Sequence, residues 1–414
     1  MSNSQCVYTH CELDMHWTLD NVQKWVHLLP KHNLAERSPK AISSSLNHPS
    51  KMKVSVLGAG NGGYALAFHL VQLGHEVLLF ESDQFKEAIE PIQNAGCINA
   101  LKECQGSTGE IHGVSKIAKA TTDIKEAMEF GNVAMLIIPS FGQGLVFEAA
   151  LPYLTKDHIF ISLPGNFAFL DYVKVMQRKS YTNDYLNIPF TLVETSSIPY
   201  ACRKVDANNV FVNGTKKMMH VGVYPSSRTQ ATMEKIKSLF SLNLIPNKNV
   251  IHTGLNNLNF LLHPVISLQN AGWIETKKGD FLFYNEGASP GVLRYLDALD
   301  QERLAIGKSF GFDMDNLLTV WSGWYGDTKS KTLEELIENA YFYSAIKAPP
   351  TLKNRYITED INYVLAPIAT YLAKKANIET PVAQALMTSA HVMTGLSVAP
   401  VRRFDEFPGD LSSI

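Results

Sequence analysis

A glycine-rich turn between two short apolar segments is the feature that most constrains the fold of this chain. Residues 53–57 (KVSVL) and 76–80 (EVLLF) have the length and apolar character of buried strands. Residues 58–63 (GAGNGG) follow the first strand and match the G-x-G-x-x-G pattern, and a helical stretch is expected at 62–73. Strand, helix and strand within about 30 residues form a βαβ unit, which implies a parallel sheet with a right-handed crossover.

Each glycine of this turn has a separate physical task. Gly58 permits a tight turn after the strand, Gly60 lets the backbone approach a pyrophosphate, and Gly63 allows the helix to pack closely on the sheet. Asn61 in the same turn is also a candidate cofactor-binding residue, and the helix that follows directs its free N–H groups and its positive dipole end at the phosphates. The turn therefore predicts a dinucleotide-binding site, and a glycine-rich turn without a ligand is the alternative.

The residue after the second strand predicts which dinucleotide binds. Glu81 stands where a carboxylate accepts hydrogen bonds from the adenine ribose hydroxyls. Its charge would also repel a 2′-phosphate, and no cation follows until Lys86. NAD is therefore the predicted cofactor, with NADP less favoured.

Apolar segments further along the chain extend the sheet and then give way to helices. More strands are expected at 133–139, 159–163 and 190–193. The Asn213-Gly214 dipeptide, a favoured two-residue turn, predicts a hairpin over 210–224. After about residue 225, helical periodicity dominates and predicts helices at 228–240, 256–276, 292–310, 333–346, 360–376 and 382–394.

These patterns predict an α/β protein in which an N-terminal Rossmann domain, a doubly wound parallel sheet, precedes a C-terminal all-α domain. We expect the Rossmann domain at 51–225 and the helical substrate domain at 226–398. Residues 1–50 are expected to be an extension and linker, and 399–414 a loosely held tail. At 139–142 (PSFG) the chain leaves the carboxyl end of a strand, so Pro139 is expected beside the nicotinamide ribose, unless the segment is a plain strand-ending turn.

Composition excludes several classes of protein. A formal net charge of −2 provides no basic excess for binding nucleic acid or an anionic membrane. No signal peptide is recognised, and no apolar run approaches the roughly 20 residues that span a bilayer. The five cysteines are scattered, which fits a reducing cytoplasm and indicates no disulfide framework. Cys6 and Cys11 beside His10 form only a weak candidate for metal ligands, so no metal is predicted. The oligomeric state stays open.

Three later segments, together with the glycine turn, carry a resemblance to a known family. They are 194–203 (ETSSIPYACR), 256–273 (NNLNFLLHPVISLQNAGW) and 354–360 (NRYITED). From about Met52 to about Ser397 the chain resembles the octopine/nopaline (opine) dehydrogenases. The resemblance implies a helical domain like the C-terminal domain of 6-phosphogluconate dehydrogenase. It also implies reductive condensation of the amino group of an amino acid with a 2-oxo acid such as pyruvate, using NAD(P)H.

His263 is the first residue to which the resemblance gives a role. A helix would place Asn256, Asn259 and His263 on one face, and Pro264 would kink that helix or mark its restart. Imidazole suits proton transfer because its ordinary pKa lies near neutral pH. The resemblance implies that His263 handles protons, whereas residue chemistry alone leaves open a histidine that simply packs in the core.

Arg355 and Asp360 carry the other implied roles. Thr358 is expected to cap a helix whose first turn holds Glu359 and Asp360, which leaves Arg355 in the loop before it. A guanidinium binds a carboxylate through two parallel bonds. The resemblance implies that Arg355 orients the oxo acid and that Asp360 supports His263. A surface pair between Arg355 and Glu359 beside an ordinary cap is the alternative.

The remaining substrate contacts are less determined by the sequence. Tyr200 and Asn259 are candidate substrate-binding residues, and Trp321, Trp324 and Tyr325 either pack in the core or line a side-chain pocket. The amine substrate and the particular 2-oxo acid stay open. Two other functions compete: a 2-hydroxy acid or polyol-phosphate dehydrogenase on the same architecture, and a non-catalytic redox sensor that binds the dinucleotide.

Overall fold

An eight-stranded sheet forms the first part of the chain in a computed structural model that describes residues 51–104, 107–340, 343, 346–411 and 414. Six neighbouring strands are parallel, and β13 runs antiparallel to β10 while pairing in parallel with β14. In spatial order the strands are β14 (Asn243–Pro246), β13 (Met218–Tyr224), β10 (Thr191–Thr195), β9 (Ile159–Ser162), β8 (Val133–Leu136), β1 (Lys53–Leu57), β2 (Glu76–Phe80) and β7 (Lys119–Thr121).

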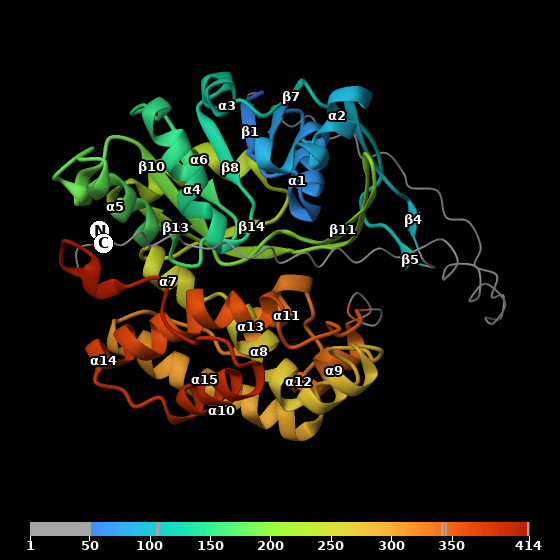
Figure 1. Ribbon diagram of the computed structural model, residues 1–414, viewed down its shortest axis with the longest axis vertical. Coiled ribbons are helices and arrows are strands. Elements are labelled where there is room, and N and C mark those ends of the chain that lie inside the picture. The colour runs from blue at the N-terminus through green and yellow to red at the C-terminus, as the bar shows by residue number, and fades with distance from the viewer. Residues whose placement is uncertain (1–50, 105–106, 341–342, 344–345, 412–413) are drawn as a thin grey trace, which may run out of the picture. The chain divides into compact units, whose positions relative to one another are not determined.

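The position of β1 in this sheet locates a ligand-binding crevice. β1 lies between β2 and β8, so the chain first extends the sheet on one side of β1 and then returns to its other side (Figure 1). In doubly wound sheets ligands bind beyond the carboxyl ends of the strands at such a reversal. Residues that follow β1 and β8 therefore border the predicted cofactor site.

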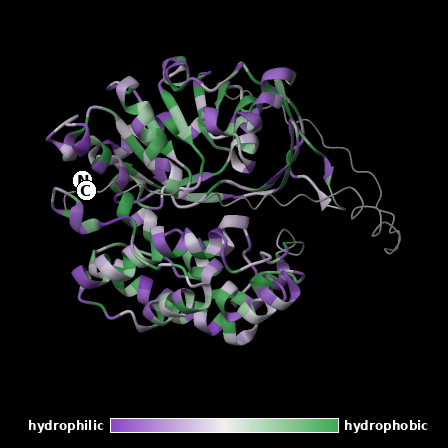
Figure 2. Ribbon diagram, viewed as in Figure 1, coloured by the Kyte–Doolittle hydropathy of each residue, from purple (hydrophilic) through white to green (hydrophobic). Residues whose placement is uncertain are grey.

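Side chains of alternate strand residues enter two cores on opposite faces of the sheet. Val54 and Val56 pack with α1 (Asn61–Gln72) and α6 (Thr229–Ile236). On the other face Leu57 and Leu136 pack with three helices, α3 (Ile124–Phe130), α4 (Ser140–Ala150) and α5 (Ala168–Arg178). Hydrophobic residues follow the strands in Figure 2. Helices on both faces confirm the predicted doubly wound α/β fold.

A second, four-stranded sheet replaces the hairpin that the sequence predicted. Its strands are, in spatial order, β11 (Tyr200–Asp206), β12 (Asn209–Thr215), β3 (Cys97–Ala100) and β6 (Gly113–Lys116). The short strands β4 (Glu103–Cys104) and β5 (Ser107–Thr108) pair separately, and α2 (Glu90–Ala95) precedes β3.

The turn predicted at Asn213-Gly214 is wrong. Both residues lie inside β12, where Gly214 pairs with Ala201 and the register skips Asn213. The chain reverses instead at residues 207–208, between β11 and β12. An extra residue beside a glycine suits a β-bulge as well as a turn, so the dipeptide alone did not distinguish the two.

Helices form most of the chain after residue 225, as predicted. The first of them, α6, packs on the sheet and β14 extends it, so the helical part beyond the sheet begins at α7. Residues 51–414 pack as one compact unit. The helices are α7 (Val250–Leu255), α8 (Asn259–Gln269), α9 (Ala271–Lys277), α10 (Pro290–Ser309), α11 (Leu317–Tyr325), α12 (Leu333–Asn339), α13 (Arg355–Thr358), the π-helical segments η9 (Asp360–Leu365) and η10 (Ile368–Leu372), α14 (Ala373–Ala376) and α15 (Pro381–Thr394). Across the described part of the chain, none of these helices is both long and apolar enough to cross a membrane.

Two details of the predicted helices are wrong. The helix expected at 256–276 is divided among three elements, because Asn256 ends α7 and a break at Asn270 separates α8 from α9. Asn256 therefore bonds Arg303 rather than sharing a face with His263, and α8 continues through Pro264. The helix expected at 333–346 ends at Asn339.

The prediction of a loosely held tail is also wrong for its described residues. The Arg402 side chain is fully buried, and Phe404 and Phe407 pack in the core of the sheet's helical face. Polar contacts of Arg402 with residues far away in the sequence hold the segment, and such contacts leave no local pattern. The candidate ligands Cys6, His10 and Cys11 lie outside the described residues. Within the described ranges no cluster of three metal-ligating side chains occurs.

Candidate active site

The glycine turn has the geometry that a dinucleotide site requires. Gly58 has a φ of 119°, and a Cβ there would lie 2.8 Å from the carbonyl oxygen of Ile137. A Cβ on Gly63 would lie 1.7 Å from the carbonyl oxygen of Gly58, so only glycine allows α1 to start this close to β1. A Cβ on Gly60 would meet nothing within 4 Å. The turn thus leaves open space beside Gly60, at the amino end of α1, where a pyrophosphate fits.

Glu81 lies directly beside this turn. One carboxylate oxygen accepts a hydrogen bond from the backbone N–H of Ala59 at 2.8 Å, and the other accepts from Ser82 at 2.8 Å. These two bonds fix the carboxylate at the end of β2 and next to the turn, where the adenine ribose lies in a Rossmann fold.

Asn61 and Lys204 connect the turn to the second sheet. The Asn61 side chain accepts from the backbone N–H of Lys204, at 2.9 Å. The Lys204 ammonium lies 4.2 Å from the centre of the Tyr64 ring and donates to the Tyr64 hydroxyl and the Ala88 carbonyl. Sequence analysis found no cation near Glu81 because Lys204 reaches this region from a distant strand. Burial lowers the pKa of this lysine, whereas the Glu81 charge raises it.

The carboxyl end of β8 joins the glycine turn to the helical part. Ile137 contacts Gly58, and Pro139 precedes the first residue of α4, Ser140. Both the backbone N–H and the hydroxyl of Ser140 donate to one oxygen of Glu359, each at 2.8 Å. Glu359 lies between α13, which starts at Arg355, and η9, which starts at Asp360. Buried hydrogen bonds therefore connect the strand end beside the predicted cofactor site to the predicted catalytic residues.

His263 and Asp360 form a close pair, as the resemblance implied. Nδ1 of His263 lies 2.8 Å from a carboxylate oxygen of Asp360. The Tyr356 ring stacks on the imidazole with a centroid separation of 4.0 Å and an interplanar angle of 18°. Only 14% of the His263 side chain and 9% of the Asp360 side chain are exposed. The carboxylate and the stacked ring fix the imidazole, and Nε2 is the nitrogen that Asp360 does not engage.

Asp360 is also the first residue of a π-helical segment. α13 ends at Thr358, and the wider turn η9 begins at Asp360. π-Helical turns often occur at functional sites because the extra residue in the turn changes the direction of side chains. In this turn two adjacent carboxylates serve different partners: Glu359 bonds Ser140 and Arg355, and Asp360 bonds His263.

Arg355 pairs with Glu359 through its Nε, at 2.6 Å. The Arg355 side chain is 64% exposed, as the alternative of a surface pair expects, but the Glu359 side chain is only 7% exposed. The pair therefore joins an exposed guanidinium to a buried carboxylate. Arg355 is the first residue of α13 rather than part of a loop, since Asn354 caps the helix by accepting from the N–H of Tyr356. The predicted cap at Thr358 is therefore wrong. The exposed guanidinium retains surface for an anionic ligand.

The two neighbouring carboxylates differ in their ease of protonation. Burial raises the pKa of Asp360, and the contact with His263 opposes this shift. Burial also acts to raise the pKa of Glu359, but Arg355 and the Ser140 donors together bring it below its usual value. Glu359 is thus a stable anion that anchors Arg355, whereas Asp360 holds its charge by its partnership with the imidazole.

The other residues that the sequence analysis offered for substrate binding lie on α8, on α11 and at the start of β11. Asn259 lies one turn before His263 on α8, and Trp321 and Trp324 are buried core residues of α11. Tyr200 is buried, and its hydroxyl lies 3.0 Å from Nδ1 of His69 on α1. No described contact joins Tyr200 to His263.

Sequence analysis missed four residues that connect the site. Ser140, Asn166 and Asn257 form buried hydrogen bonds between the strand ends and the start of α8, and Tyr356 stacks on His263. Ser140, Asn257 and Tyr356 lie inside the segments 139–142, 256–273 and 354–360, and only Asn166 lies outside every segment that the sequence analysis singled out.

Comparison with known proteins shows similarity to opine dehydrogenases. Residues 246–394 match the family model for the alpha-helical domain of NAD/NADP octopine/nopaline dehydrogenases. Residues 53–167 match the model for the N-terminus of NAD-dependent glycerol-3-phosphate dehydrogenase. An opine dehydrogenase of Arthrobacter sp. (strain 1C) is 29% identical over 334 residues, which cover 80% of this chain and 88% of that protein. The helical part of the chain is therefore similar to the opine dehydrogenases, and its N-terminal part to an NAD-binding domain.

Solved structures of the opine dehydrogenase family have the same fold. An octopine dehydrogenase solved with NADH and agmatine aligns with a TM-score of 0.67 at 20% identity, over 83% of this chain and 90% of that one. An octopine dehydrogenase solved with NADH and pyruvate aligns over the same shares, at 20% identity and a TM-score of 0.64. These likenesses confirm the predicted order of a Rossmann domain and a helical domain.

Substitutions at two glycines separate cofactor binding from folding. We expect Gly60→Ala to change the free energy of unfolding by less than about 0.5 kcal/mol, because its Cβ meets no protein atom within 4 Å. The methyl group would occupy pyrophosphate space and weaken NADH binding about tenfold or more. Gly63→Ala should lower the free energy of unfolding by about 1–3 kcal/mol or more, because its Cβ overlaps the Gly58 carbonyl. Urea unfolding without cofactor and fluorescence titration with NADH measure the two effects. Equal destabilisation by both substitutions, or unaltered NADH binding by Gly60→Ala, contradicts the assignment.

Proposed function

We propose that this protein catalyses the NADH-dependent reductive condensation of an amino acid with a 2-oxo acid. The observation that carries the proposal is the contact between the end of β8 and the 355–360 segment: Ser140 donates to Glu359, and Ile137, three residues earlier, lies beside the glycine turn. That segment holds Arg355 at the start of α13 and Asp360 at the start of η9, and Asp360 bonds His263. An anion-binding group and a proton-handling group therefore adjoin the cofactor site.

The overall chemistry is balanced in two steps. The amine attacks the carbonyl carbon of the 2-oxo acid, and loss of one water gives an imine. Addition of one hydride and one proton to the C=N bond gives a secondary amine that carries both carboxylates. When bound, NADH supplies that hydride at the carboxyl ends of the strands.

Residues of the chain perform the other tasks. The exposed guanidinium of Arg355 binds the carboxylate of the 2-oxo acid, and Glu359 holds the Arg355 side chain in place. His263 donates a proton to the oxygen that leaves as water, and it recovers a proton afterwards. Asp360 fixes the imidazole so that Nδ1 carries the shared proton and Nε2 faces the substrate. Asn259, one turn earlier on α8, contacts the substrate beside His263.

The nature of the substrates is inferred from relatives. Octopine dehydrogenases of the same fold were solved with NADH and pyruvate or agmatine, and the matching Arthrobacter protein is an opine dehydrogenase. A 2-hydroxy acid or polyol-phosphate dehydrogenase shares the cofactor domain, since the glycerol-3-phosphate dehydrogenase match ends at residue 167. The opine reaction is favoured because the octopine/nopaline match covers the helical part that holds His263 and Arg355.

The deciding experiment measures NADH oxidation with pyruvate and a panel of basic, small and apolar amino acids, separately and together. We expect oxidation only when a 2-oxo acid and an amino acid are both present, and mass spectrometry should show a product with the summed mass of both acids minus one oxygen. Oxidation with the oxo acid alone would support a hydroxy acid dehydrogenase instead. NADH binding without turnover of any pair would support a non-catalytic sensor.

Asp360 provides a test of the proton-handling pair. Asp360→Asn removes the charge beside Nδ1, so kcat should fall about a hundredfold or more, the size of a general acid–base contribution. Asp280→Asn makes the same change at an exposed pair with Lys347 and is the matched control. Steady-state kinetics and circular dichroism of both variants check the prediction. An Asp360→Asn enzyme with the kcat of the wild type would show that the pair has no role in turnover.

Glu81 supports NAD over NADP as the cofactor of this dinucleotide site. Its carboxylate is held beside the turn, and its charge would oppose a 2′-phosphate. We expect a lower KM for NADH than for NADPH, and Glu81→Gln should reduce that preference about tenfold, the effect of one charged hydrogen bond. Glu76→Gln, at the other end of β2, is the matched control. A wild-type preference for NADPH would contradict the proposal.

Cysteine chemistry supports a reducing compartment. Cys97, Cys104 and Cys202 are free thiols in the structure. We propose the cytoplasm as the setting of the reaction.

A further inference from the structure

A buried arginine from the C-terminal segment occupies the carboxyl edge of the sheet. Arg402 lies outside the helices of the substrate domain, yet its side chain has no exposed surface. Its Nη1 donates to the carbonyl oxygens of Gly165 and Asn166, at 2.9 and 2.5 Å. Its Nη2 donates to the Gln143 side chain at 2.8 Å and to the carbonyl oxygen of Ser140 at 3.3 Å.

These acceptors come from the two loops that follow β8 and β9. Ser140 and Gln143 belong to the first turn of α4, and Gly165 and Asn166 lie between β9 and α5. The third donor of Arg402, Nε, binds the Asp171 carboxylate on α5 at 2.9 Å. One guanidinium therefore ties together both strand ends that border the nicotinamide side of the predicted cofactor site.

The loop after β9 needs such support because its backbone conformation is unfavourable. Asn166 and Phe167, two consecutive non-glycine residues, have φ values of 58° and 67°. Arg402 binds the carbonyl groups of this loop, and the buried Glu194 carboxylate accepts from the N–H of Phe167 at 3.0 Å. Charged groups from two distant segments thus hold a conformation that the residues would not adopt alone.

Two hydrogen-bonded routes lead from this arginine to the catalytic residues. In the first, Arg402 binds the Ser140 carbonyl, Ser140 donates to Glu359, and Glu359 accepts from Arg355.

The second route leads to α8. Asn166 donates from its side chain to Ser140 at 2.9 Å and accepts from Asn257 at 2.5 Å. Asn257 in turn accepts from the backbone N–H of Asn259, the first residue of the helix that carries His263. Both the anion-binding and the proton-handling residues are therefore connected to the position of Arg402.

We propose that Arg402 is a positioning residue for the 2-oxo acid site, acting through Ser140 and Glu359 on Arg355 and through Asn166 and Asn257 on α8. This inference rests on the proposed function, which assigns the 2-oxo acid to Arg355. The C-terminal segment is then part of the active site's supporting structure rather than a tail.

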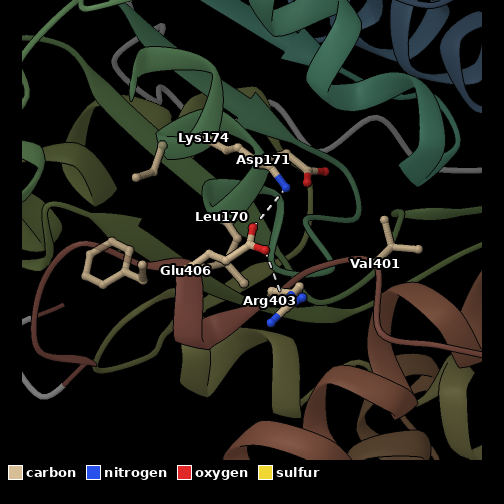
Figure 3. A pocket seen from close by; sticks show the side chains of 8 residues that line it. Leu170, Asp171, Lys174, Val401, Arg403 and Glu406 are labelled. Carbon is tan, nitrogen blue, oxygen red and sulfur yellow. Dashed lines mark hydrogen bonds and ion pairs between the residues drawn. The ribbon is translucent and has the colours of Figure 1, made fainter. Parts of the chain in front are cut away.

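The residues on either side of Arg402 allow a matched control. Figure 3 shows the segment against α5, where Glu406 pairs with Lys174 at 2.9 Å and with Arg403 at 3.2 Å. Arg403 leaves 46% of its side chain exposed, pairs with Asp405 and Glu406 of its own segment, and lies over the Tyr371 ring. Substitutions at Arg403 therefore test attachment of the segment without touching the strand-end loops.

The experiment compares full-length Arg402→Lys and Arg402→Gln with Arg403→Lys and Arg403→Gln. Lysine keeps the charge, but its single ammonium group cannot bind all the acceptors that the guanidinium holds. Both Arg402 variants should raise the KM for the 2-oxo acid about tenfold to a hundredfold, with NADH affinity within about twofold of wild type. Hydrogen–deuterium exchange should increase in residues 138–144, 163–168 and 354–360. The Arg403 variants should change neither the KM for the 2-oxo acid nor the hydrogen–deuterium exchange of these segments.

The outcomes separate this inference from the proposed function. If the wild-type enzyme turns over and Arg402→Lys leaves the KM for the 2-oxo acid unaltered, the positioning role is wrong. The positioning role is also wrong if Arg402→Lys lowers kcat at constant KM, because that result indicates a smaller fraction of active enzyme. A wild-type protein without turnover overturns the proposed function, and the exchange measurement then still decides whether Arg402 holds the three segments.

Two further variants keep the test decisive if Arg402→Gln does not fold. Asp171→Asn removes only the carboxylate partner of Arg402 and should raise the same KM by a smaller factor. Combining Arg402→Lys with Glu359→Gln should give less than the product of their separate KM effects, because both act on Arg355. Full multiplication of the two effects contradicts the first route.

Discussion

The buried carboxylate of Glu359 is the contact on which the site depends. It accepts two hydrogen bonds from Ser140 at the end of a sheet strand and one from Arg355 on its own helix. A carboxylate with so little exposure is favourable only when charged donors or N–H groups satisfy it. Loss of either partner would leave the buried negative charge without one of its donors, which is unfavourable. The sheet and the helix therefore hold each other in one arrangement. The distance between cofactor and substrate groups follows from that arrangement.

The π-helical turn after Glu359 explains how one short helix serves several groups. Tyr356 stacks on His263, Asp360 bonds its Nδ1, and Arg355 remains exposed at the start of the helix. A regular α-helix would direct adjacent carboxylates 100° apart, whereas the wider turn changes that angle at Asp360. The two carboxylates can then face a strand end and an imidazole at the same time.

Local patterns predicted the elements of the fold, and tertiary contacts decided the rest. The glycine turn, β1, α1 and β2 depend on residues close in the sequence, so they could be recognised directly. The pairing of His263 with Asp360 followed from a family resemblance, since residues 97 apart share no local pattern. Ser140 and Arg402 were missed for the same reason. The turn expected at Asn213-Gly214 failed because that dipeptide suits both a turn and a strand, and pairing with β11 selects the strand. The cap expected at Thr358 failed because Asn354 starts the helix four residues earlier.

The stacking of Tyr356 on His263 has a consequence for how this enzyme could diversify. The groups proposed to hold the oxo acid and to move protons all belong to, or touch, the 355–360 segment. A rotation of that helix would disturb the ring face, the carboxylate and the guanidinium together, so its sequence tolerates little change. Variation in the accepted amine must therefore arise on surfaces that this helix does not supply. Substitutions on those surfaces can alter the accepted amine while the proposed reduction groups stay in place.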